Sequence, residues 1–212
     1  MRFFFILVTL LLALELPAQH AVPLHSLNDG DLLFVVTPQG NAITQVTQGV
    51  QQLPVDHVAI FHWRTTDSIA TVVQAIGKGV VMEPLDSLYS ESSPGSFLLV
   101  GRLNCDFDTT ASITRAMTFL GCPYDYYYEP GDSAIYCSEL VLKSYVGHSG
   151  NFIFSPIPMT FRDSSGAVPE YWTRHYAKRG LKVPEGEPGS NPGDLSRRPC
   201  VSLLGRLDPL GK

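Results

Sequence analysis

Three apolar runs that follow one another with only short connections between them constrain the fold of this chain more than any other feature. They cover residues 57–62, 70–76 and 80–83, and the tight turn Gly77-Lys78-Gly79 joins the last two. Runs of this length between turn residues are typical of β-strands, and a connection this short joins antiparallel neighbours. The sequence therefore predicts an antiparallel meander.

The segments around the meander complete an α+β pattern. Residues 32–36 are continuously apolar, as in a strand covered on both faces, and residues 97–103 form a further strand. Apolar spacing, capping residues and Gly or Pro boundaries predict helices elsewhere. These lie within residues 38–50, 84–89, 108–120, 137–146 and 171–176. We therefore expect an α+β fold, an antiparallel sheet with helices packed on one side.

The first 18 residues predict a secretory signal peptide. One basic residue precedes an apolar run over residues 3–14, and Pro17 ends this run short of the about 20 apolar residues that a membrane span needs. We expect cleavage after Ala18 or Ala21, no membrane span thereafter, and an exported protein in the periplasm or outside the cell. The alternative is an uncleaved anchor.

Length and charge limit what the remainder of the chain can be. About 190 residues suffice for one hydrophobic core, which we assign to residues 26–182. Residues 183–212 are rich in Pro, Gly, Ser and Arg and predict an extended or partly disordered C-terminal tail. The formal net charge of −5, without a basic cluster, argues against a nucleic-acid partner.

The chain contains four cysteines, Cys105, Cys122, Cys137 and Cys200. Their spacing predicts no disulfide framework, and the absence of a CxxC or HxxxH pair predicts no zinc site. We expect at most one disulfide among Cys105, Cys122 and Cys200, a free Cys137, and neither a metal nor an organic cofactor.

Cys137 is the candidate nucleophile because it stands where irregular chain becomes a helix. Free N–H groups at a helix start favour the thiolate and stabilise an oxyanion, although a buried core thiol is the alternative. His57, at the start of a strand, is the candidate base, with a structural histidine as the alternative. On the next strand Gln74 would accept from the imidazole and fix its tautomer. Two alternatives stay open: Glu83 is the third residue instead, or Gln74 faces solvent and has no role in the site.

The order of short motifs resembles a known group of enzymes. The motifs are GDLLF at 30–34, DHVAI at 56–60, VVQA at 72–75, GVVMEPL at 79–85, GCPYD at 121–125, YCSELV at 136–141 and EPGSNPGDLS at 187–196. With histidine far before cysteine, this order resembles the YaeF/YiiX group of permuted papain-like amidases, in the NlpC-type superfamily of cysteine hydrolases. The resemblance implies a circularly permuted papain-like catalytic domain over residues 26–182.

The resemblance also implies roles for individual residues. Cys137 would be the nucleophile, His57 its base and Gln74 the third polar residue, where group members often carry an acidic residue or histidine. A neutral partner orients the imidazole but does not stabilise imidazolium as a carboxylate would. Tyr124 or Tyr136 would donate to the oxyanion or line the cleft, and packing alone is the alternative for both.

These residues predict an exported cysteine hydrolase that cleaves an amide or peptide bond through an acyl-enzyme. The expected substrate is a peptide or an acyl-amide, with a cell-wall peptide as the leading candidate. Acyl transfer from a lipid or N-acyl donor uses the same residues. The aromatic side chains at 124, 126–128, 152, 154 and 172 suit an acyl pocket, with core packing as the alternative for most of them. The third hypothesis is a cell-envelope binding module on a degenerate hydrolase fold.

Overall fold

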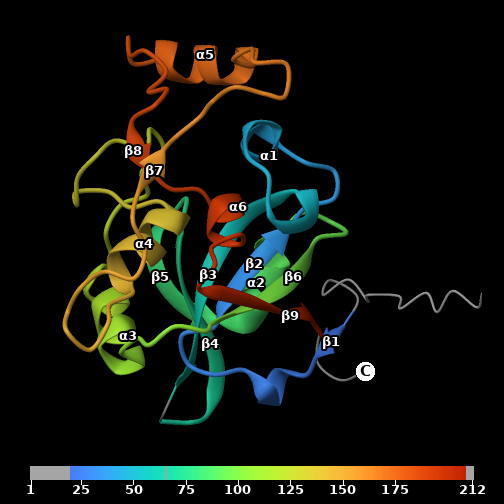
Figure 1. Cartoon of the computed structure of the whole chain (residues 1–212), viewed down its shortest axis with the longest axis vertical. Coiled ribbons are helices and arrows are strands. Elements are labelled where there is room, and N and C mark those ends of the chain that lie inside the picture. The colour runs from blue at the N-terminus through green and yellow to red at the C-terminus, as the bar shows by residue number, and fades with distance from the viewer. Residues whose placement is uncertain (1–19, 65, 209–212) are drawn as a thin grey trace, which may run out of the picture.

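A central sheet organises the computed structural model, which describes residues 20–64 and 66–208 (Figure 1). Within these residues the sheet has seven strands, in the order β1-β9-β6-β2-β3-β4-β5. Their bounds are Ala21–Val22 for β1, Leu32–Val36 for β2, Val55–Arg64 for β3, Ile69–Ile76 for β4, Gly79–Pro84 for β5, Phe97–Leu103 for β6 and Val201–Leu207 for β9. The predicted signal peptide, residues 1–18, lies outside the described residues.

The predicted meander is confirmed in β3, β4 and β5, which pair antiparallel in chain order. Gly79 makes the last turn possible: its φ is +101°, and a Cβ there would come within 2.5 Å of the Cys122 carbonyl oxygen. Val80 donates its N–H to that same oxygen (2.8 Å). The turn glycine therefore lets the stretch before the Cys137 helix lie directly against the edge strand β5.

In the described part of the chain, six α-helices and two short 3-10 helices lie between the strands. They are α1 (Ala42–Val46), α2 (Leu85–Glu91), α3 (Thr109–Thr118), α4 (Cys137–Ser144), α5 (Glu170–Ala177) and α6 (Pro192–Leu195), with η2 (Leu24–Ser26) and η3 (Val50–Gln52). A separate two-stranded sheet joins β7 (Ile157–Pro158) to β8 (Pro188–Gly189). Among residues 20–64 and 66–208, no helix has the length and apolar character needed to cross a bilayer.

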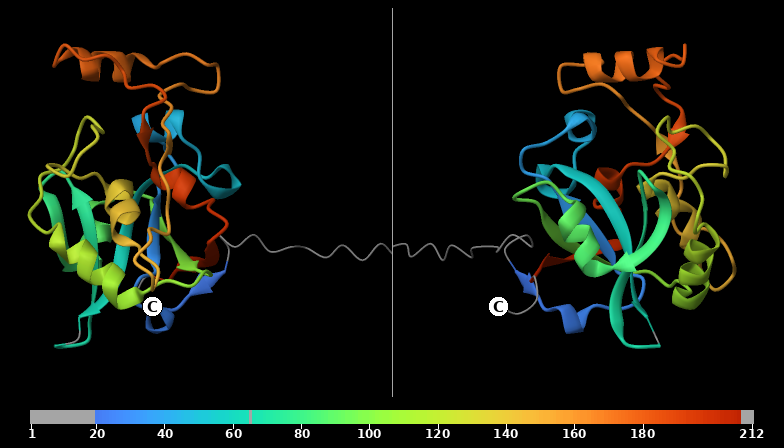
Figure 2. Two further views of the ribbon diagram at one scale, coloured as in Figure 1. Left: turned by 60° about the vertical axis from the view of Figure 1, so that its left-hand side comes forward. Right: turned by 180° about the vertical axis from the view of Figure 1, so that it is seen from behind.

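The two faces of the sheet carry separate parts of the core. On one face, Ile60 and Val73 pack with Leu140 and Val141 of α4, beside residues of α3 and α6. On the other, α2 covers alternate side chains of the same strands through its buried Leu85 and Leu88. Figure 2 shows α2 in front of the sheet when the molecule is seen from behind. The α+β class is confirmed, and α2 adds a helix on the second face.

The C-terminal segment belongs to the core, and the prediction of an extended or partly disordered tail is wrong. β9 lies inside the sheet, antiparallel to β6 and parallel to β1. The Pro and Gly that suggested disorder form a helix start instead, because Asn191 caps α6 and Pro192 occupies its first turn. Leu195 of α6 is fully buried.

The structure has all four cysteines as free thiols. Cys105 and Cys200 are neighbours at the paired ends of β6 and β9, where the Asn104 N–H donates to the Cys200 carbonyl (2.9 Å). Burial, together with the adjacent Cys105 thiol, raises the pKa of Cys200. The single disulfide that the sequence allows stays a prediction, and this pair is the one placed to form it.

We expect Leu195→Ala to lower the free energy of unfolding by about 2–5 kcal/mol, because it leaves a cavity under α6. Leu181→Ala is the matched control, since Leu181 is 39 % exposed and loses little packing. Urea unfolding of the two variants measures the difference. Equal, small effects would mean that the C-terminal segment is not part of the cooperative core.

Candidate active site

Cys137 is the first residue of α4, directly after the N-cap residue Tyr136. The first intrahelical hydrogen bond runs from the Leu140 N–H to the Tyr136 carbonyl (3.0 Å), so the N–H groups before Leu140 have no partner within the helix. Within the helix, Glu139 forms an ion pair with Lys143 one turn later (2.8 Å). Fully buried Val141 anchors the helix, so the start of α4 presents both a thiol and free N–H donors.

His57 reaches the thiol because of a β-bulge. In the β2–β3 pair Val35 lies opposite His57 and Val36 opposite Val55, which leaves Asp56 as an extra residue. Bulges bend a strand and redirect neighbouring side chains, and they are over-represented beside active sites. The imidazole of His57 then lies close enough to Cys137 for that side chain to influence its pKa.

Gln74 contacts His57 through the imidazole Nε2. Its Oε1 lies 2.8 Å from His57 Nε2, and its side chain is fully buried. Glu83, the alternative third residue, contacts the amide of Gln74 instead (3.4 Å). With Nε2 occupied by Gln74, Nδ1 is the ring nitrogen left for the Cys137 thiol.

Opposing effects determine the protonation of His57. Burial alone would lower its pKa, but the negative charge and hydrogen bond of Cys137 act in the other direction. Gln74 and Asp56 add to this, and the net result is a pKa raised above the ordinary histidine value. A base with a raised pKa beside Cys137 is suited to accept the thiol proton, which gives the form in which a cysteine is nucleophilic.

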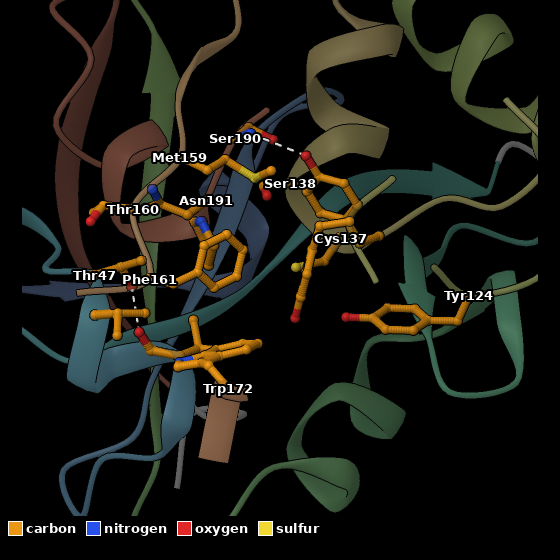
Figure 3. Close-up of a pocket in the computed structure, with 15 residues that line it drawn as sticks. Thr47, Tyr124, Cys137, Ser138, Met159, Thr160, Phe161, Trp172, Ser190 and Asn191 are labelled. Atoms are coloured by element: carbon orange, nitrogen blue, oxygen red, sulfur yellow. Dashed lines mark hydrogen bonds between the residues drawn. The ribbon is translucent and has the colours of Figure 1, made fainter. Parts of the chain in front are cut away.

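The two tyrosines singled out from the sequence line the same pocket as Cys137 and differ in their contacts. Figure 3 shows the Tyr124 hydroxyl directed toward Cys137. Burial, with the negative charge of Cys137, raises the pKa of Tyr124 well above its usual value, so the phenol stays a hydrogen-bond donor. The Tyr136 hydroxyl accepts the N–H of Ser190 (3.1 Å), and burial raises its pKa to about 12. Tyr136 therefore holds a wall of the site in place.

A largely apolar pocket opens beside Cys137 (Figure 3). Its lining comes from segments far apart in the sequence: Ile43, Val46, Thr47, Tyr124, Tyr128, Tyr136, Cys137, Ser138, Met159, Thr160, Phe161, Trp172, Ser190, Asn191 and Pro192. Of the aromatic residues expected here, positions 124, 128 and 172 line it. Positions 126, 127 and 152 do not, and Phe154 is buried in the main core instead. No local pattern points to Met159 or Phe161, because their approach depends on the β7–β8 connection.

Donor clusters for a metal are absent from the part of the chain that the structure describes. Within residues 20–64 and 66–208, no three His, Cys, Asp or Glu side chains are arranged to hold an ion. The chemistry that these residues offer is that of a thiol, an imidazole and hydrogen-bond donors.

Comparisons with known proteins agree with this fold. The sequence pattern of a family described as "Permuted papain-like amidase enzyme, YaeF/YiiX, C92 family" matches residues 26–204. The structure is similar to the crystal structure of metalloprotein yiiX from Escherichia coli O157:H7, with a TM-score of 0.67 and 21 % sequence identity. The match covers 86 % of this chain and 98 % of that one, which confirms the fold. No curated protein matches the chain.

We expect Cys137→Ala to lower the pKa of His57, because burial would then act without the negative partner that offsets it. A ¹⁵N NMR titration of the imidazole measures this shift. His148, whose side chain is 63 % exposed, serves as the internal control and should not move. An unchanged His57 pKa would show that the thiol and the imidazole do not interact.

Proposed function

The chain belongs to the YaeF/YiiX family of permuted papain-like amidases, and we propose that Cys137 and His57 carry out its cysteine-amidase chemistry. The observation that carries this proposal is the convergence of three separate elements on one point. The start of α4 supplies Cys137, the β3 bulge supplies His57, and β4 supplies Gln74. This is the arrangement in which a base activates a nucleophile and a third group orients the base.

In the proposed reaction, His57 Nδ1 takes the thiol proton and Cys137 Sγ attacks the amide carbonyl carbon. The backbone N–H of Cys137 and the Tyr124 hydroxyl donate to the developing oxyanion. The imidazolium then returns its proton to the leaving nitrogen, the C–N bond breaks and a thioester forms. Water, deprotonated by His57, attacks the thioester, which releases the carboxylic acid and restores the thiol.

The structurally similar yiiX protein is described as a metalloprotein. The described residues of this chain provide no cluster of donors that fits such an ion. No step of the proposed reaction is therefore assigned to a metal.

For location and substrate, we propose an exported enzyme that acts on a cell-wall peptide. The support for export is the apolar run after Arg2, with Pro17 and Ala18 behind it. The support for a peptide substrate is the amidase family, and the cell wall is the peptide source that export would make accessible. N-terminal sequencing of the protein recovered outside the cytoplasm should find a mature chain that begins at Gln19 or Val22. An intact N-terminus in the membrane fraction would support an uncleaved anchor instead.

A second candidate function is hydrolysis or transfer of a fatty-acyl group by the same residues. The observation that favours it is the pocket beside Cys137, where Val46, Met159, Phe161 and Trp172 present apolar side chains. A ligand whose acyl chain entered this pocket would have its carbonyl near Cys137. The two candidates differ in what the pocket holds, an apolar amino-acid side chain or an alkyl chain.

We expect Cys137→Ala and His57→Ala each to reduce amide hydrolysis by about 10³-fold or more, since nucleophile and base act as a unit. Cell-wall peptides and N-acyl amino acids are incubated separately, and mass spectrometry identifies the products and any acyl group on Cys137. Cys122→Ala is the control, because this half-buried thiol lies outside the pocket. Full activity in both active-site variants would rule out the proposed pair.

A series of N-acyl substrates distinguishes the two candidates. If the pocket binds an alkyl chain, kcat/KM should rise by up to about fourfold for each added methylene until the pocket is full, which corresponds to about 0.8 kcal/mol per buried CH₂. Peptide substrates with the same leaving group provide the reference. A kcat/KM that does not change with chain length would leave only the peptide candidate.

A further inference from the structure

Behind Gln74 lies a layer of charge that the proposed reaction does not use. The Gln74 Nε2 group donates to Glu83 on β5 (3.4 Å) and to Glu91 at the end of α2 (3.3 Å). Lys78, in the turn between β4 and β5, forms ion pairs with both carboxylates, 3.2 Å from that of Glu91. The side chains of Glu83 and Glu91 are 18 % and 37 % exposed, whereas Gln74 is fully buried.

The two carboxylates determine which end of the Gln74 amide faces His57. Carboxylates accept hydrogen bonds, so the amide NH₂ must point toward Glu83 and Glu91. The amide oxygen then points toward His57 Nε2, as the 2.8 Å contact shows. An oxygen there accepts only from a protonated Nε2, which leaves Nδ1 of the neutral imidazole unprotonated.

We propose that Glu83 and Glu91 are positioning residues that act through Gln74 to select the catalytic tautomer of His57. This inference rests on the proposed roles of Cys137 and His57. If the Gln74 amide flipped, its NH₂ would donate to Nε2, the ring proton would move to Nδ1, and His57 could not take the thiol proton. Glu83 and Glu91 prevent that flip, although neither contacts the reacting atoms.

The experiment uses the full-length protein with Glu83→Gln and Glu91→Gln combined. The amide groups introduced at positions 83 and 91 can donate as well as accept hydrogen bonds. They can therefore pair with either end of the Gln74 amide, and its flipped state becomes accessible. We expect alkylation of Cys137 by iodoacetamide at neutral pH to slow by roughly ten- to a hundredfold, less than the about 10⁴-fold loss caused by a wholly wrong tautomer. The ¹⁵N shifts of neutral His57 should change from the Nε2–H form toward the Nδ1–H form.

A third substitution, Gln74→Glu, should have opposite effects on the alkylation rate in the double variant and in the wild-type background. In the double variant, Gln74→Glu should restore the alkylation rate to within about threefold, because a carboxylate accepts at both of its oxygens. In the wild-type background the same substitution should slow alkylation, since it places a third carboxylate beside Glu83 and Glu91. If Gln74→Glu slows alkylation in both backgrounds, or the double variant keeps the Nε2–H form, the proposal is overturned.

Glu170→Gln is the matched control, since it neutralises an exposed carboxylate on α5. Thermal unfolding of each variant identifies any that lose the fold, and the NMR tautomer is read only in folded protein.

The outcomes separate the two proposals. If wild type and His57→Ala were alkylated at the same rate, the proposed function itself would be overturned. If His57→Ala slowed alkylation but the double variant at Glu83 and Glu91 did not, only the positioning role would be overturned.

Discussion

The packing of α4 on β3 and β4 is the interaction on which the site depends. Buried Leu140 and Val141 hold the helix against Ile60 and Val73, so its first turn meets the strand that carries His57. The chain from β4 to α3 separates the histidine from the cysteine, and this contact brings the two together. The same contact directs the free N–H groups of the helix toward the place where an oxyanion would form.

Electrostatics explain why a glutamine can stand where a carboxylate would be expected. Position 74 is fully buried, and an ionised group there would have lost its hydration without full compensation. The structure places the negative charges one step outward, on the partly exposed Glu83 and Glu91, with Lys78 beside them. The amide between them and His57 transmits orientation rather than charge. The pKa of His57 is instead raised mainly by the negative charge of Cys137, against the effect of burial.

The pocket beside Cys137 connects the fold to substrate choice. One wall comes from the segment after β8, where Ser190 donates its N–H to Tyr136, and another from Trp172 of α5. The first wall is fixed because α6 and β9 tie the C-terminal segment into the core and the sheet. A segment that looked like a tail therefore shapes the surface that a substrate would meet.

The order of amino acids alone predicts the α+β class, the meander and the positions of α1 to α5. It also makes His57, Gln74 and Cys137 the candidate site residues. Local patterns suffice for the fold class and its elements because periodicity, turns and caps act over a few residues. The three site residues rest in addition on the order of motifs that the chain shares with its family. Three further features are visible only in the folded chain: β9 joins the sheet, Glu83 lies behind Gln74 rather than against His57, and Met159 lines the pocket. These features arise from contacts between residues far apart in the chain, which no local pattern encodes.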